Sequence, residues 1–413
     1  MIAVTRFEPE PRLLNRNFLL YMGGWAVTAF AYFGILGVLF NLFLLRLGFG
    51  AEFIGVLTGS GQLAWALCAL PAGLYVRRFG LRIGLMTGAL AQAVSITAML
   101  SVETLPREIW PAWLFGWWIV TWMGAAPLAV SGAPLLMQVS PIHRRRETFT
   151  AQAVMLGIVA FAGSLVAGQL PIWFAPMLNA SLDQPAPYRV ALYLVPISYA
   201  LAFPIWSRLK LAPIAIPASS ESHDRQPTRL LAVLAVMVFL QTAAEGALRA
   251  FFNVYLDQQL LTPVSAIGLI GAFAQVISVA TALSIPAVLK WAGNANTLGA
   301  VTFGIAVCMT VMALVPTLAV AAISYVLAIS LIGIAAQARQ LFSQELVAPH
   351  WRTTVSSVNN VGVGLGWSSA AGLGGVVVGA AGFAGVFGIG AALSLAAAVS
   401  MAAFTAARRR ASH

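Results

Sequence analysis

Charged residues are scarce in this sequence. Asp, Glu, Lys and Arg make up 8% of its 413 residues and hydrophobic residues 60%, whereas soluble proteins carry about a quarter charged residues. The two cysteines lie in apolar runs of opposite halves, a placement that excludes a disulfide framework and a cysteine metal site. The four histidines fall in predicted loops or tails, and the sequence contains no nucleophile group or nucleotide-binding loop. We therefore expect an integral membrane protein that is not an enzyme and holds no metal or other cofactor.

Long apolar runs occupy most of the chain. The first run, at 18–45, follows a polar basic segment at 1–17, and each run is long enough to cross a bilayer core of ~30 Å as a helix. The others lie at 53–76, 81–103, 110–138, 148–174, 188–207, 230–256, 264–289, 294–315, 317–346, 355–380 and 383–406. The sequence thus predicts an all-α membrane protein with twelve transmembrane helices.

The distribution of Arg and Lys predicts the orientation. With the N-terminus inside, the inner segments hold 18 of these residues and the outer segments three, and cytoplasmic loops of membrane proteins are enriched in Arg and Lys. Both termini are therefore predicted to be cytoplasmic, including the tails 1–17 and 407–413. The same asymmetry explains the net charge of +11 without a nucleic-acid partner, because basic loops face the anionic inner leaflet.

The two halves of the chain resemble each other. A polar segment at 210–229 is predicted to be a cytoplasmic linker between bundles at 18–209 and 230–406. The pair Phe40-Asn41 matches Phe252-Asn253, and Gly80 matches Gly293. Matches at a nearly constant offset indicate a duplicated six-helix unit, and two such units related by an axis along the membrane normal are typical of transporters.

A loop motif connects the chain to a family. Gly73, Arg78, Gly80 and Arg82 resemble the inner-loop signature of the major facilitator superfamily, although Arg77 stands where the family has an acid. The resemblance implies two six-helix bundles around a central cavity, a small-molecule substrate, a monomer, and a place in the bacterial cytoplasmic membrane. It also implies that the first, fourth, seventh and tenth helices line the cavity.

Glu245 is the acid most clearly inside an apolar run, roughly 24 Å from Arg229 along a helix. A proton-coupled carrier needs a carboxylate that gains and loses a proton as access alternates, so we interpret Glu245 as a cavity-facing proton-coupling residue. The alternatives are a structural ion pair with Arg249, one turn away, and a pair that faces lipid.

Two arginines are candidate substrate contacts. Arg249 either contacts substrate or extends to the outer headgroups. Arg339 lies about 12–15 Å from the inner end of its helix, where its guanidinium either binds a carboxylate or phosphate or pairs with Glu345 or helix carbonyls. The neighbouring amides Gln241 and Gln337 are further candidates for substrate binding.

Four residues of the N-terminal half complete the predicted substrate site. Tyr32 and Asn41 belong to the first helix, and Trp118 and Trp122 lie one turn apart in the fourth. The tryptophans either form a stacking wall of the cavity or belong to an aromatic belt and to helix packing. Asn41 is expected to line the cavity, whereas Gln62 and the other amides are expected to join the two halves, with hydrogen bonds between neighbouring helices as the alternative.

These features predict a secondary active transporter. We expect it to move a small organic solute by alternating access, with a proton or another ion as the coupling partner. Export of drugs or other amphipathic compounds is an alternative, although the run at 148–174 lacks the Gly-Pro of the family's antiporter signature. A lipid flippase and a membrane scaffold without transport activity are alternatives of another class.

Overall fold

The computed structural model describes residues 15–140, 144–211, 228–347 and 351–411, and every extended regular element in these ranges is a helix. Most of the predicted N-terminal tail, most of the linker and the end of the basic tail therefore lie outside the described residues. The first helical rod, a continuous run of helix, consists of α1 (Arg16–Ala29), the π-helix η1 (Phe30–Leu36) and α2 (Gly37–Arg46). Asn15 caps it by accepting a hydrogen bond from the Phe18 N–H.

The remaining helices follow the apolar runs closely. In the first half they are α3 (Ala51–Phe79), α4 (Leu81–Leu100), α5 (Trp110–Val139), α6 (Arg145–Met177), α7 (Pro185–Leu192) and α8 (Leu194–Ser207), with short 3₁₀ turns η2 (Val102–Thr104) and η3 (Arg107–Ile109). In the second half they are α9 (Thr228–Gln258), α10 (Val264–Ala292), α11 (Asn294–Leu314), α12 (Leu318–Glu345) and α13 (Arg352–Ala411).

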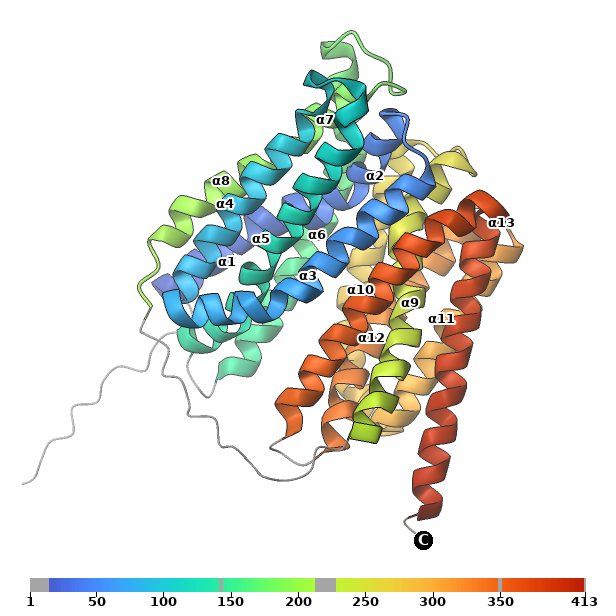
Figure 1. Ribbon diagram of the computed structural model, residues 1–413. Helices are drawn as coiled ribbons and strands as arrows, with labels where there is room; N and C mark the ends of the chain where they lie inside the picture. The colour runs from blue at the N-terminus through green and yellow to red at the C-terminus, as the bar shows by residue number, and fades with distance from the viewer. Residues whose placement is uncertain (1–14, 141–143, 212–227, 348–350, 412–413) are drawn as a thin grey trace, which may run out of the picture.

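Eleven helices of the described ranges are long and apolar enough to cross a membrane, and the last candidate span runs over 49 residues, Val358–Ala406. A helix of that length would measure about 74 Å, more than twice the bilayer core. Gly382 interrupts it with a left-handed φ of 66°, and Figure 1 shows α13 reversing direction. This break lies where the sequence predicts a boundary between two spans. The structure contains eleven candidate spans in the described ranges, and the expected count of twelve transmembrane helices stays a prediction.

Helices α1–α8 group on one side of the molecule and α9–α13 on the other (Figure 1). The two groups meet along α3 against α13 and α6 against α10. We call the end that carries Arg46 and Asp257 the outer end and the end that carries Gly80 and Gly293 the inner end, after the predicted orientation. Gly80 and Gly293 have left-handed φ values of 94° and 76° at matching helix junctions, which gives the predicted sequence repeat a structural counterpart.

A close helix crossing provides a stability prediction. A Cβ on Gly34 would collide with the Gly163 backbone, whereas a Cβ on Gly23 of the same rod would meet nothing within 4 Å. Gly34→Ala is therefore expected to destabilise the N-terminal bundle by about 1–3 kcal/mol through overpacking. Thermal unfolding in detergent measures this loss, with Gly23→Ala as the matched control. Equal unfolding temperatures for the two variants would contradict the crossing.

Candidate functional site

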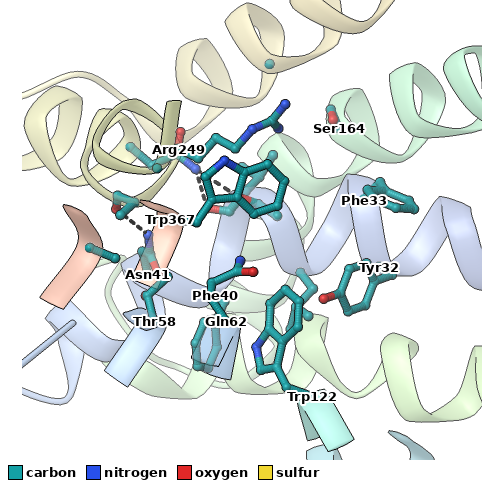
Figure 2. A pocket seen from close by; sticks show the side chains of 18 of the residues that line it. Tyr32, Phe33, Phe40, Asn41, Thr58, Gln62, Trp122, Ser164, Arg249 and Trp367 are labelled. Carbon is teal, nitrogen blue, oxygen red and sulfur yellow. Dashed lines mark hydrogen bonds between the residues drawn. The ribbon is translucent and has the colours of Figure 1, made fainter. Parts of the chain in front are cut away.

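A cavity of about 250 Å³ lies between the two halves, and residues of both line it. Figure 2 shows Arg249 and Trp367 near the side chains of Gln62, Trp122 and Tyr32 across the cavity. From the N-terminal half the wall includes Tyr32, Asn41, Thr58, Gln62, Trp118 and Trp122. From the C-terminal half it includes Arg249, Asn253, Tyr325 and Trp367.

Local backbone features shape the wall of the N-terminal half. The π-helix η1 contributes Tyr32 to the cavity, and such segments frequently mark functional sites because an added residue changes the helical register. Gly61 provides space for the two indoles, since a Cβ there would collide with the Nε1 atoms of both Trp118 and Trp122. Aromatic contacts order this wall further, because Phe40 stacks on Trp118 at 4.3 Å between ring centroids.

Arg249 is the charged side chain of the described cavity lining. It is exposed, and its guanidinium carbon lies 5.6 Å from the centroid of the Trp367 ring, within the range of a cation–π contact. It forms no ion pair with a carboxylate among the described residues. The cavity therefore presents an uncompensated positive charge next to an aromatic surface.

Glu245 lies in a buried polar cluster behind this wall. It is 1% exposed, and its Oε1 lies 3.3 Å from Nη1 of Arg339, which is itself buried. The same Nη1 donates a hydrogen bond to Gln241 at 3.1 Å, and Gln241 donates to the Thr302 hydroxyl at 2.9 Å. We call Gln241, Glu245, Thr302 and Arg339 the Glu245 cluster.

Trp367 connects the cluster to the cavity. Its Nε1 donates to Oε2 of Glu245 at 3.4 Å, while its ring lines the cavity under Arg249. A continuous chain of contacts thus runs from Arg249 through Trp367 and Glu245 to Arg339.

The expectation that Glu245 faces the cavity is wrong, because Glu245 does not line the described cavity. The alternative ion pair with Arg249 is not found either, since the ion-pair partner of Glu245 is Arg339. The four-residue spacing on α9 would allow Glu245 to pair with Arg249, but the structure brings the Arg339 guanidinium of α12 to the Glu245 carboxylate instead. The predicted alternative pairing of Arg339 with Glu345 does not form either, and the Glu345 Oε1 accepts a hydrogen bond from Asn294 at 2.6 Å.

The other predicted residues are distributed over three places. Tyr32, Asn41, Trp118, Trp122 and Arg249 meet at the cavity, and Gln241 belongs to the Glu245 cluster. Gln337 is exposed and does not line the cavity. The motif residues Arg78, Gly80 and Arg82 line a separate recess at the junction of α3 and α4, and Gly73 lies in the last turns of α3.

The two halves are joined by polar contacts on the outer side of the cavity. Asn41 donates to the Ala250 carbonyl at 3.0 Å, and its repeat partner Asn253 donates to the Gly37 carbonyl at 2.9 Å. Beyond them Arg46 makes a bidentate contact with Asp257 at 2.7 and 2.8 Å. We call the Arg46–Asp257 pair the outer clamp. These contacts close the outer end and make the duplicated Asn residues part of the closure.

Sequence reasoning missed Trp367 and Thr58. Trp367 is a lone tryptophan in a glycine-rich stretch, a composition that indicates only close helix packing. A large aromatic side chain among small residues was the one signal in the sequence that could have identified it. Thr58 lies one turn before Gln62, but a threonine in an apolar helix is too common to indicate a site.

No group of three or more potential metal ligands occurs among the described residues. The arrangement consists of two helical bundles, a central cavity and a buried ionisable cluster, which together define the class of membrane transporters. The family model of the Major Facilitator Superfamily matches residues 20–371. The chain belongs to the major facilitator superfamily, and the resemblance carried by the loop motif is confirmed.

Solved structures agree with this fold. The chain is similar to a variant of the nucleoside transporter NupG, with 15% identity, a TM-score of 0.74, and coverage of 94% of this chain and 99% of that one. It is also similar to a bacterial homologue of the human lysosomal transporter Spinster in an inward-facing, unoccupied conformation (14% identity, TM-score 0.66, 94% of each chain). A third is the human organic anion transporter MFSD10 (13% identity, TM-score 0.62, 94% and 99%). No curated protein matches the chain.

Proposed function

We propose that this protein is a secondary active transporter that moves a small organic solute by alternating access and couples it to a proton at Glu245. The observation that carries the proposal is the chain of contacts from the cavity to a buried carboxylate through Trp367. Placement as a monomer in a bacterial cytoplasmic membrane is part of the same proposal.

Coupling follows from the charges. When Glu245 is ionised, it neutralises Arg339 and accepts the hydrogen bond from Trp367. Protonation removes that negative charge, leaves the Arg339 charge uncompensated, and weakens the contact that holds the indole. Because Trp367 supports Arg249, protonation changes both the geometry and the electrostatic potential at the cavity. Solute binding and proton binding are thereby linked, and linkage is reciprocal.

The cavity also bears on the alternatives. A scaffold would keep Glu245 and Arg249 paired in a packed core, whereas Arg249 forms no ion pair among the described residues and faces a cavity. This arrangement favours transport. Export of amphipathic compounds is a second candidate that the aromatic wall supports, and the direction of the proton gradient that drives movement distinguishes it from uptake.

The coupling residue is tested by Glu245→Gln. Purified protein in proteoliposomes is given a pH gradient and a panel of solutes (nucleobases, aromatic carboxylates, amino acids and sugars), and solute accumulation is followed together with internal pH. We expect Glu245→Gln to abolish gradient-driven accumulation and to retain solute exchange, because the amide cannot release a proton. Glu345→Gln, outside the cluster, is the matched control and should behave as wild type. Driven accumulation that survives Glu245→Gln would refute the coupling role.

A further inference from the structure

The charge of the cavity limits the substrate. Arg249 faces the cavity and lacks a carboxylate partner among the described residues, while the nearest buried acid, Glu245, is neutralised by Arg339. An unpaired guanidinium at membrane depth is unfavourable without a counter-charge. Its planar donors match a carboxylate or a similarly delocalised anion in a bidentate geometry. The site therefore favours a ligand with one negative charge and disfavours cations.

The aromatic surfaces limit the ligand's shape. Phe40 and Trp118 stack with an interplanar angle of 13°, and Trp118 meets Trp122 edge to face at 6.0 Å between centroids. On the opposite side lies the Trp367 ring beneath Arg249. Rigid rings on both sides suit a flat ligand that stacks on them. A volume of about 250 Å³ lies below the range of ~300–1,000 Å³ typical of drug-sized ligands, so we expect one or two rings.

Unsatisfied polar atoms in the cavity wall indicate which polar groups the ligand carries at the edge of its ring. Four cavity-lining side chains each have a buried polar atom without a hydrogen-bond partner: Thr58 Oγ1, Gln62 Oε1, Trp118 Nε1 and Trp122 Nε1. Trp118 is only 4% exposed. Buried polar groups are normally paired, and leaving one unpaired is destabilising. The two indole N–H groups require acceptors, and the Gln62 carbonyl requires a donor. Thr58 and Gln62 lie on α3 and the two tryptophans on α5, so the unpaired atoms belong to one wall of the cavity.

We propose that the cavity binds a planar organic monoanion whose ring edge carries both a hydrogen-bond acceptor and a donor. The anionic group contacts Arg249, the ring stacks between the tryptophans, and the ring edge meets Trp118, Trp122 and Gln62. This inference rests on the proposed transport function and names its substrate class. A neutral nucleobase would form hydrogen bonds with the unpaired wall atoms but would leave the charge of Arg249 uncompensated. A simple aromatic acid would pair with Arg249 but would leave the wall atoms unpaired.

Three ligands of similar size separate these possibilities. Orotate has both features, uracil has the polar ring edge without the carboxylate, and benzoate has the carboxylate without the polar edge. Binding to detergent-purified full-length protein is measured by isothermal titration calorimetry. We expect orotate to bind at least about tenfold more tightly than either uracil or benzoate. Uracil leaves Arg249 without a counter-charge, and benzoate leaves the polar atoms of the wall unpaired. Equal affinity for uracil and orotate, equal affinity for benzoate and orotate, or no binding of orotate would overturn the proposal.

Matched variants assign the contacts. Arg249→Gln is expected to remove the preference for orotate over uracil, and Arg249→Lys to restore part of it. Arg208→Gln removes a positive charge from the end of α8, away from the cavity, and should leave the preference unchanged. Trp122→Phe keeps the ring and removes the N–H, so it should reduce the preference for orotate over benzoate. Retention of both preferences in Arg249→Gln and Trp122→Phe would contradict the assignment.

Failure of this inference and failure of the proposed function are distinguishable. Calorimetry requires no transport, whereas movement of solute and protons is measured in vesicles. Orotate that binds selectively but crosses no membrane would support the site and refute the transporter. Driven movement of a neutral or cationic solute, without selective orotate binding, would support the transporter and refute the substrate class.

Discussion

Replacement of Arg339 by methionine is expected to destabilise the folded protein by about 3–5 kcal/mol, because it leaves the Glu245 carboxyl group buried without its partner. Glu245 is 1% exposed, and Arg339 is the cation within ion-pair distance of it. The double variant Glu245→Gln/Arg339→Met removes both charges and should recover most of the loss, since an ion pair replaced as a whole has little effect on stability. Unfolding in detergent with increasing denaturant measures all three proteins.

Arg249→Met is the matched control for this cycle. It lies on α9 near the cluster and is exposed to the cavity without an acidic partner among the described residues. We expect its unfolding free energy to stay within about 0.5 kcal/mol of wild type. A double variant no more stable than Arg339→Met would show that the Glu245–Arg339 pair does not stabilise the fold as described.

Loss of the outer clamp is expected to open the outer end. Asp257 and Arg46 share two short hydrogen bonds and are largely buried, with side-chain exposures of 11% and 19%. Charge-assisted bonds of this kind contribute about 1.5–3 kcal/mol, so Asp257→Asn should raise the outward-open population about 10- to 100-fold. The readout is labelling of a Thr58→Cys reporter, in a background without Cys68 and Cys308, by an impermeant thiol reagent added on the outer side.

Glu103→Gln provides the control for the clamp. It removes a comparable ion pair, with Arg189 at 2.6 Å, but both residues belong to the N-terminal half. Its labelling rate should match wild type, because no contact between the halves is lost. Equal acceleration in Glu103→Gln and Asp257→Asn, or none in Asp257→Asn, would show that the clamp does not hold the outer end closed.

The helices and their repeat were predictable because they depend on local pattern. Apolar runs of transmembrane length appear as helices with nearly the predicted boundaries. The matched pairs Gly80 and Gly293, and Asn41 and Asn253, occupy corresponding places in the two halves. The π-helix at Phe30–Leu36, which packs against α6, was not predicted, because the apolar pattern of the segment does not distinguish it from an α-helix.

The site was predictable as a set of residues but not as a set of contacts. Sequence spacing places Glu245 and Arg249 on one helix face, yet the ion pair forms with Arg339, a residue 94 positions away in the chain. Such pairing depends on how α9 and α12 pack and on the direction of each side chain. Trp367 was not identified for the same reason, because its role depends on contacts with Glu245 and Arg249 of α9, and Glu245 is 122 positions away in the chain.

Alternation between outward- and inward-open states is the central claim, and distances across both ends test it most directly. Spin labels at Glu52 and Leu261 span the halves at the outer end, and labels at Phe79 and Trp291 span them at the inner end; the four side chains are exposed. Pulsed electron spin resonance in lipid is compared between wild type and Asp257→Asn. The account predicts a second population in which the outer distance lengthens as the inner one shortens, and this population grows in Asp257→Asn. A single distance at each end in both proteins would contradict it.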